Sequence, residues 1–179
     1  RAIGMRAAKM VNEHDSILMA SGTSILYAAK ELIYKKNITV ITASVSASSM
    51  LSQNKDIDVV QLGGIVRESS VSVVGSFAED MLKYFNCSLL FMGADGVDLD
   101  FGVTTTNMME ANLNRMMMNT SQQTVLLVDS SKFGKKGFSK ICDIGEIDRI
   151  ITDENIPKMY LENLQELGIE VTVVPIAKS

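Results

Sequence analysis

Histidine and cysteine, on which many metal sites and nucleophilic active sites depend, are almost absent from this chain. One histidine, His14, and two cysteines, Cys87 and Cys142, occur among 179 residues. Two cysteines at this spacing form neither a disulfide framework nor a zinc motif, so a reducing compartment is expected. A Ser-His-Asp triad would have to use His14, which lies in a polar stretch typical of a protein surface. We therefore predict no metal site and no cofactor.

Long apolar runs and an excess of positive charge are also missing. No stretch approaches the length of a membrane span and no signal peptide precedes the first predicted strand, so we expect a cytoplasmic protein without membrane contact. The formal net charge of -4 disfavours wide contact with nucleic-acid phosphates. Any contact with DNA is expected through another part of the protein. The chain opens at Arg1 inside a helical pattern that includes Ile3, Ala7 and Val11, so a preceding segment is expected.

What is present is the composition of one globular domain, with 46% hydrophobic and 21% charged residues and no internal repeat. Patterns typical of strands and of helices alternate along it. Strands are predicted at residues 16–20, 38–42, 57–62, 89–92, 124–128, 149–152 and 171–174. Helices are predicted at residues 25–33, 45–50, 76–84, 107–118 and 157–167, and in the opening segment. This alternation predicts an α/β fold, a mainly parallel sheet with helices on both faces.

Short polar loops directly follow several predicted strands. They are Ser21-Gly22-Thr23, Thr42-Ala43-Ser44, Gly63-Gly64, Gly93-Ala94-Asp95 and Asp129-Ser130-Ser131-Lys132. The carboxyl ends of parallel strands meet at one edge of a sheet, and that edge is where such folds bind ligands. The coincidence of these loops therefore predicts a small-molecule site at that edge.

The stretch 89–115 carries the densest set of candidate residues. Glycines on both sides of Asp95 allow a tight turn and a close approach to a ligand. Gly102 precedes a hydroxyl-rich loop, and Asn107 and Glu110 have the spacing of a helix N-cap and its reciprocal acid. Two plainer interpretations stay open: Asp95 as an ordinary turn residue, and Glu110 as a cap for the amide of Asn107.

Two other loops offer groups that suit an anion. Ser21-Gly22-Thr23-Ser24 supplies hydroxyls and free amides at a helix start, where the helix dipole is positive. A plain N-cap at Ser21 or Thr23 is the alternative. Asp129 and Lys132 bring an acid and an amine to a strand end, where a weak surface ion pair is the alternative.

Two further features are interpreted as structural. Arg67 either pairs with Glu68 within its loop or anchors a ligand, and the loop role is favoured. A group of methionines is interpreted as adaptable filler of the core or of a subunit contact, so a homo-oligomer is expected. The group consists of Met108, Met109, Met116, Met117 and Met118.

A series of short motifs occurs in order along nearly the whole chain. They are Ser21-Gly22-Thr23, Thr42, Gly63-Gly64, Gly75, Gly93-Ala94-Asp95-Gly96, Gly102-Val103-Thr104, Asn107, Glu110-Ala111, Arg115, Asp129-Ser130-Ser131-Lys132-Phe133-Gly134 and Ile151-Thr152-Asp153. With these motifs, residues 3–174 resemble the C-terminal effector-binding domain of DeoR-family bacterial transcriptional regulators. The resemblance implies a Rossmann-like fold related to ribose-5-phosphate isomerase and CoA transferases. It also implies that residues 1–179 are a single effector-binding domain, separate from an N-terminal winged helix-turn-helix domain that binds operator DNA.

The resemblance further implies a phosphorylated sugar as effector and repression of sugar-metabolism genes. The expected ligand-binding residues are Ser21, Gly22, Thr23, Ser24, Thr42, Gly63, Asp95, Gly102, Glu110, Asp129 and Lys132. Two positions depart from the family pattern: Ala43, where Thr-Asn-Ser is usual, and Asn114, where a lysine commonly precedes the arginine. These departures bear on which ligand binds more than on its class.

In this hypothesis the phosphate binds at Ser21-Gly22-Thr23-Ser24 or on Lys132, and the carboxylates accept hydrogen bonds from sugar hydroxyls. Two alternatives stay open. One is a sugar-phosphate isomerase with Asp95 or Glu110 as general base and Lys132 stabilising an enediolate. The other is an oligomerisation module whose pocket has lost its function.

Overall fold

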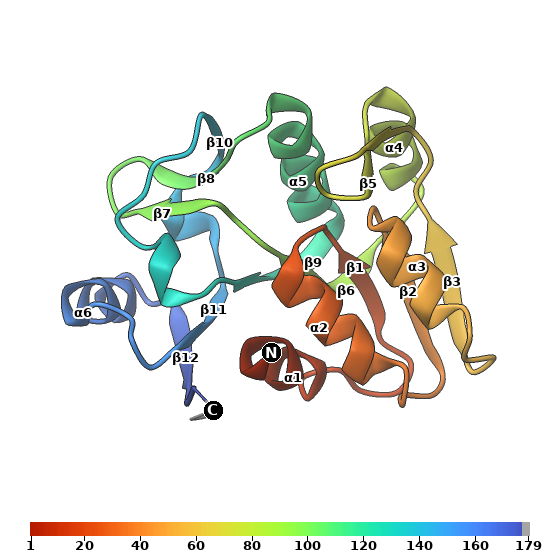
Figure 1. Cartoon of the computed structure of the whole chain (residues 1–179), viewed down its shortest axis with the longest axis horizontal. Coiled ribbons are helices and arrows are strands. Elements are labelled where there is room, and N and C mark those ends of the chain that lie inside the picture. Colours follow the sequence, from red (N-terminus) through yellow and green to blue (C-terminus); the bar gives the residue numbers. More distant parts are fainter. Residues whose placement is uncertain (177–179) are drawn as a thin grey trace.

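The computed structural model describes residues 1–176, and these residues build a main sheet of seven parallel strands in the order β12-β11-β9-β6-β1-β2-β3 (Figure 1). The strands are β1 (Ser16–Met19), β2 (Ile38–Thr42), β3 (Ile57–Gln61), β6 (Cys87–Met92), β9 (Ser121–Leu127), β11 (Arg149–Asp153) and β12 (Glu170–Val174). The chain runs outward from β1 to β3 and then returns to β6 on the other side of β1. The strand order therefore changes direction between β1 and β6, the position at which open α/β sheets leave a crevice.

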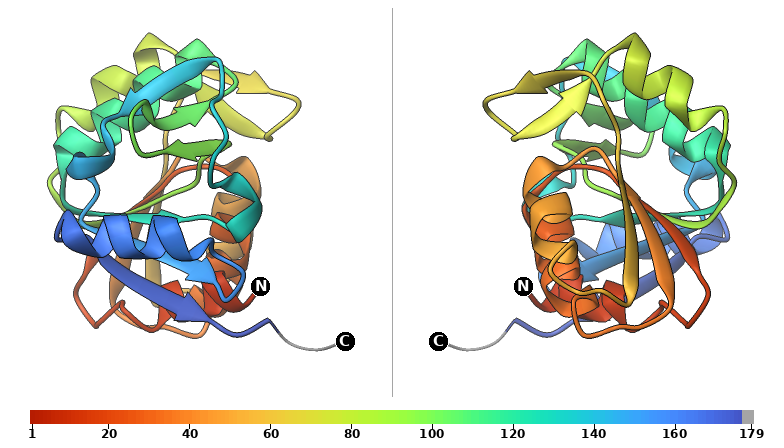
Figure 2. Two further views of the ribbon diagram at one scale, coloured as in Figure 1. Left: turned by 90° about the vertical axis from the view of Figure 1, so that its left-hand side faces the viewer. Right: turned by 90° about the vertical axis from the view of Figure 1, so that its right-hand side faces the viewer.

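Helices cover both faces of this sheet, so the predicted α/β architecture is confirmed (Figure 2). One face carries α1 (Ala2–Ala8), α2 (Thr23–Leu32) and α3 (Val45–Leu51), and the other carries α4 (Ser76–Leu82), α5 (Met108–Thr120) and α6 (Lys158–Glu166). Ile17 and Met19 of β1 pack toward the first face and Leu18 toward the second. Alternate residues of a strand point to opposite faces, so a strand covered on both must be apolar throughout. None of the helices within residues 1–176 is both long and apolar enough to cross a membrane.

Short strands that the sequence did not predict add two smaller sheets. An antiparallel sheet, here called the small sheet, contains β7 (Gly96–Asp98), β8 (Gly102–Thr105) and β10 (Ser139–Cys142). A hairpin pairs β4 (Ile65–Arg67) with β5 (Ser72–Val74). The expectation of a loop after Gly102 was therefore wrong. Strands of three or four residues are too short to show a period of two, and β10 joins its partner only through the tertiary fold.

The predicted boundaries also moved where strand pairing extends an element. Cys87 pairs with Ser121, so β6 and β9 both begin earlier than their apolar runs suggested. Two 3-10 turns complete the described chain, η1 (Ser130–Lys132) and η2 (Ile144–Glu146). Hydropathy locates the buried part of a strand, whereas backbone pairing decides where the strand begins.

Gly102 has a structural reason to be glycine. Its φ is +99°, and a Cβ atom there would lie 2.2 Å from the carbonyl oxygen of Cys142 on β10. Residues with a side chain rarely adopt such a φ, and the overlap would push β8 and β10 apart. Gly102 therefore allows the close approach of two strands in the small sheet.

We expect Gly102→Ala to lower the free energy of unfolding by at least about 2 kcal/mol, from a left-handed conformation and a steric overlap together. Gly168→Ala is a matched control, because Gly168 has φ +79° and a Cβ atom at that position would meet nothing within 4 Å. It should lose only about 1 kcal/mol. Urea denaturation measures both. Equal losses would show that the approach to Cys142 does not constrain this position.

Candidate functional site

A cavity of about 520 Å³ opens at the carboxyl edge of the main sheet, where β1, β6 and β9 end. It lies between the start of α2, the turn η1, the start of α5 and the β4–β5 hairpin; Figure 1 labels α2, α5 and β5. Its lining comprises Ser21, Gly22, Thr23, Ser24, Ile25, Leu26, Ser46, Arg67, Ser69, Ser70, Val71, Gly93, Ala94, Asp95, Thr105, Thr106, Glu110, Leu127, Val128, Asp129 and Lys132. Polar groups from distant parts of the chain therefore meet at one place.

Eight of the eleven residues expected to bind ligand line this cavity. They are Ser21, Gly22, Thr23, Ser24, Asp95, Glu110, Asp129 and Lys132. The other three lie outside the lining that residues 1–176 form. Thr42 is buried, and its hydroxyl donates to the Met19 carbonyl at 2.9 Å and accepts from the Ser44 N–H at 3.0 Å. Gly63 is exposed at the base of the hairpin, and Gly102 lies in the small sheet. The contacts of Thr42 and Gly102 indicate structural roles.

Glu110 joins three elements around the cavity. The Asn107 side chain accepts hydrogen bonds from the Met109 and Glu110 N–H groups, each at 3.0 Å, so the predicted N-cap of α5 is present. The expected reciprocal bond, from the Asn107 N–H to the Glu110 carboxylate, is absent among residues 1–176. Its Oε1 accepts from the Ser21 hydroxyl at 2.9 Å, and its Oε2 forms an ion pair with Arg67. The preferred interpretation of Arg67, as a loop cation paired with Glu68, was therefore wrong.

Asp95 is held by residues at the end of β8. Its Oδ2 accepts hydrogen bonds from the Thr105 hydroxyl at 2.9 Å and from the Thr106 N–H at 3.1 Å. Its own N–H donates to the Thr104 carbonyl at 2.9 Å. These contacts attach the loop after β6 to the end of β8, so the small sheet sets the orientation of this carboxylate in the cavity.

The start of α2 presents unfilled donors to the cavity. Gly22 is the N-cap, with φ 131°, and has no side chain to cap the helix, so the alternative of a plain N-cap at Ser21 or Thr23 was wrong. The first N–H groups of a helix lack partners within the helix, and the helix dipole is positive there. Thr23 and Ser24 line the cavity at this end. The arrangement can accept an anionic group.

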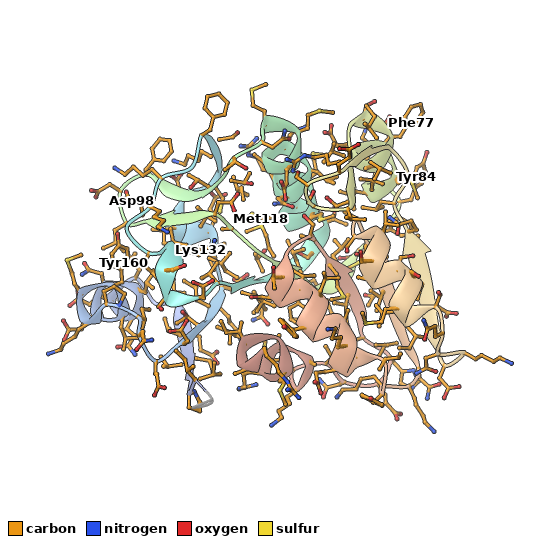
Figure 3. The ribbon with its side chains drawn as sticks, in the orientation of Figure 1. Phe77, Tyr84, Asp98, Met118, Lys132 and Tyr160 are labelled. Carbon is orange, nitrogen blue, oxygen red and sulfur yellow. The ribbon has the colours of Figure 1, made fainter. Side chains whose placement is uncertain are left out.

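The turn η1 carries Lys132 into the cavity, and Figure 3 labels this residue. Asp129 caps the turn by accepting from the Ser131 N–H at 2.9 Å, and among residues 1–176 no ion pair joins Asp129 to Lys132. Asp153, at the end of β11, accepts from the Ser130 N–H at 2.7 Å. Two carboxylates thus fix the backbone that positions the amine.

Of the residues that the hairpin contributes, the sequence singled out only Arg67, as a ligand anchor in its less favoured interpretation. Arg67 ends β4, Ser69 and Ser70 lie between β4 and β5, Thr105 ends β8, and Thr106 follows it. A basic residue in a serine-rich loop, shortly after the Gly63-Gly64 turn at the same sheet edge, was the available signal for Arg67. Its partner Glu110 lies 43 residues away and could not be identified from spacing.

The histidine and the cysteines lie outside the cavity lining formed by residues 1–176. His14 is exposed, as predicted. Both thiols are buried, and burial raises the pKa of Cys142 to about 12, so that thiol stays protonated at neutral pH. Within the described residues no group of three or more His, Cys, Asp or Glu side chains is placed to hold a metal ion.

Asp153 should make the protein sensitive to acid. Burial alone would raise the pKa of its carboxyl, but hydrogen bonds from Ser130 and the Asn155 N–H outweigh burial and hold the pKa below its usual value. A lowered folded-state pKa means that the contribution to stability is present above the unfolded-state value, about 3.9, and is lost as pH falls through the folded-state value.

We expect Asp153→Asn to cost about 1 kcal/mol of unfolding free energy at pH 7, and this difference should shrink as pH falls below about 4. Denaturant titrations at pH 7, 5 and 3 measure it. Asp58→Asn is the control, because Asp58 is exposed on β3. A loss that stays constant with pH would show that charge at Asp153 is not what stabilises η1.

Comparison with known proteins agrees with this geometry. Residues 1–154 match the family described as the DeoR C terminal sensor domain. The chain is 35% identical over 178 residues to the uncharacterized HTH-type transcriptional regulator YulB of Bacillus subtilis, covering 99% of this chain and 69% of that protein. It is 30% identical over 166 residues to the transcriptional repressor AccR of Agrobacterium fabrum, covering 92% of this chain and 64% of that protein. The chain thus spans about two thirds of the length of these relatives.

Solved structures share the fold at much lower identity. Ribose 5-phosphate isomerase A of Methanocaldococcus jannaschii aligns with a TM-score of 0.54 and 18% identity, over 93% of this chain and 65% of that one. The enzyme of Neisseria gonorrhoeae gives a TM-score of 0.53 and 18% identity, over 75% and 52% of the two chains. The predicted relation to the isomerase fold is confirmed. By the family match and its regulator relatives, the chain belongs to the DeoR family of transcriptional regulators, as a C-terminal sensor domain.

Proposed function

We propose that this domain binds a phosphorylated sugar in the cavity and thereby alters DNA binding by a separate N-terminal domain of the same protein. The observation that carries the proposal is the meeting of Asp95, Glu110 and Asp129 with Lys132 and the amino end of α2 in one cavity. Carboxylates suit sugar hydroxyls, and an amine and helix N–H groups suit a phosphate. The family match and the regulator relatives support a sensing role.

The cavity is large enough for such a ligand, since small-molecule sites span roughly 300 to 1,000 Å³. We place the phosphate at the first turn of α2, with Lys132 supplying a charged contact. Hydrogen bonds that involve a charged group contribute about 1.5–3 kcal/mol each, so three or four of them give the micromolar to millimolar affinity that suits a metabolite sensor.

Regulation requires the effector to prefer one arrangement of the protein over another, because a ligand with equal affinity for both shifts nothing. In our proposal the protein is a homo-oligomer that represses sugar-metabolism genes. Effector binding changes how its N-terminal winged helix-turn-helix domains are spaced relative to operator half-sites. The exposed Met108 on α5 and Phe77 on α4 are compatible with a subunit contact, and Phe77 is labelled in Figure 3. Light scattering on the full-length regulator tests the oligomeric state.

The alternative, a sugar-phosphate isomerase, is favoured by the shared fold and by the same carboxylates. Against it stand the family match and the relatives, which are transcriptional regulators. We expect no conversion of ribose 5-phosphate by the purified domain in a coupled assay. Turnover that Glu110→Gln abolishes would replace the sensor proposal with the enzyme.

A thermal-shift screen tests the sensor proposal directly. One or more phosphorylated sugars should stabilise the domain, because a ligand at 100 times its dissociation constant adds about 2.7 kcal/mol, or roughly 5–10 °C for a domain of this size. The same sugars without phosphate are the control and should have little effect. A melting temperature indifferent to the whole panel would support the third interpretation, an oligomerisation module without a working pocket.

Lys132→Ala should weaken binding of the stabilising sugar phosphate about 10-fold or more, on the scale of one lost charged contact. Calorimetry measures the affinity. Lys135→Ala is the matched control, because Lys135 is exposed just after η1 and lies outside the cavity lining formed by residues 1–176. If both variants bind like the parent protein, Lys132 is not part of the site.

A further inference from the structure

The β4–β5 hairpin forms one wall of the cavity and is attached unevenly to the rest of the molecule. On its inner strand β5, the Val73 N–H donates to the Ala43 carbonyl at 2.9 Å, and just before that strand the Val71 carbonyl accepts from the Val45 N–H at 3.0 Å. The outer strand β4 is a sheet edge, and its Ile65 and Val66 side chains are 65% and 55% exposed. The inner strand is therefore anchored in the fold, whereas the outer strand is held mainly through the hairpin itself.

Arg67 is the residue of β4 that crosses the cavity. Its guanidinium pairs with Glu110 on α5 and lies 3.5 Å from the Ser70 hydroxyl. The Arg67 and Glu110 side chains are only 20% and 17% exposed, so this pair is shielded from water far more than an ordinary surface pair. Shielding strengthens the attraction, and it also makes an unpaired charge costly. The pair, here called the latch, therefore holds the outer strand β4 to α5 on the opposite wall of the cavity.

The same guanidinium lies at the mouth of a site already suited to an anion. Ser21, which precedes the open N–H groups of α2, donates to the other oxygen of Glu110. A phosphate bound at α2 would be next to Ser21 and would compete with Glu110 for Arg67. Arginine recognises phosphate through two parallel N–H bonds, as it does a carboxylate.

We propose that Arg67 is an effector-binding residue that exchanges Glu110 for the ligand's phosphate, so that binding moves the β4–β5 hairpin. This inference rests on the proposed sensing function and adds a residue and a switch to the same site. Glu110 keeps its bond from Ser21 and accepts a sugar hydroxyl in place of the guanidinium. In the bound state the Arg67–phosphate pair offsets the loss of the Arg67–Glu110 pair, and hydroxyl donors keep the Glu110 carboxylate hydrogen-bonded, which allows the two arrangements to be close in free energy.

The backbone at the base of the hairpin suits such a movement. Gly64 has φ +143°, and a Cβ atom there would lie 2.5 Å from the Val74 carbonyl oxygen, so the turn before β4 requires glycine. Hinges are a few loop positions that absorb changes in φ and ψ, and small residues such as the Gly63-Gly64 pair suit that role. The serine-rich tip, which includes Ser69 and Ser70, moves with Arg67 and lines the cavity.

Substitutions on the two sides of the latch should have opposite effects on phosphate binding. Arg67→Ala should bind inorganic phosphate at least about 10-fold more weakly, and Arg67→Lys should be intermediate because an ammonium lacks the two-pronged donor geometry. Glu110→Gln keeps the shape of the side chain at position 110 and removes the charge that holds the Arg67 guanidinium. This variant should therefore bind inorganic phosphate at least about threefold more tightly than the parent protein. An NMR titration measures these affinities. Lys83→Ala, in an exposed pair on α4, is the control for loss of one positive charge.

Both Arg67→Ala and Glu110→Gln should bind the sugar phosphate found in the thermal-shift screen more weakly than the parent protein. Arg67→Ala loses the contact with the phosphate, and Glu110→Gln loses the carboxylate oxygen that accepts from a sugar hydroxyl. If Glu110→Gln weakens inorganic phosphate as much as Arg67→Ala does, the pair is only structural and the exchange is overturned. If the parent protein binds the sugar phosphate and Arg67→Ala binds it equally well, this inference fails while the proposed function stands.

Hydrogen exchange tests the latch without any ligand. Amides of residues 65–74 should exchange at least about 10-fold faster in Arg67→Ala than in the parent protein, with β1, β6 and β9 unchanged. Unchanged hydrogen exchange in the hairpin would overturn the latch.

If no phosphorylated sugar and no phosphate binds the parent protein, the proposed function fails, and the proposed switch of Arg67 from Glu110 to the phosphate fails with it.

Discussion

Parallel pairing of β9, β6 and β1 is the constraint on which the candidate site depends. In this register Met19 lies beside Phe91, and Met92 lies beside Leu126, so the three strands end at nearly the same level. The loops that follow carry Ser21, Asp95 and Asp129 into one cavity although they are spread over more than one hundred residues of sequence. A slip of one residue would exchange the two faces of a strand, and burial on both faces opposes it.

The cavity combines acids that the protein itself holds in place with donors that are left open. Asp95 is bonded by Thr105 and Thr106, and Glu110 by Ser21 and Arg67. Groups already oriented in this way lose little freedom when a ligand binds, which favours affinity and specificity. The negative net charge of the chain does not conflict with an anionic ligand, because an anion responds to the helix start and the cations beside it more than to the sum of distant charges.

The elements added to the parallel sheet give the cavity its walls. The small sheet positions Asp95, and the hairpin supplies Arg67. Arg115 connects α5 to β10, since its guanidinium donates to the carbonyls of Ile141 at 2.8 Å and Lys140 at 2.7 Å. The helix that carries Glu110 is thereby fixed to the small sheet, while β4 of the hairpin reaches it through the Arg67 ion pair. One side of the cavity is thus fixed by hydrogen bonds to backbone carbonyls, and the other is joined to α5 by the Arg67 ion pair.

The sequence by itself determined the α/β class, the parallel main sheet and the edge at which polar groups gather, because apolar runs and turn residues are local signals. It also identified the N-cap at Asn107 and most of the expected ligand-binding residues that line the cavity, since each of them directly follows a strand or begins a helix. Only the tertiary structure decided the partners of those residues. The pairing of Glu110 with Arg67, the small sheet that holds Asp95, and the structural roles of Thr42 and Gly102 depend on contacts between segments distant in sequence, for which spacing along the chain carries no signal.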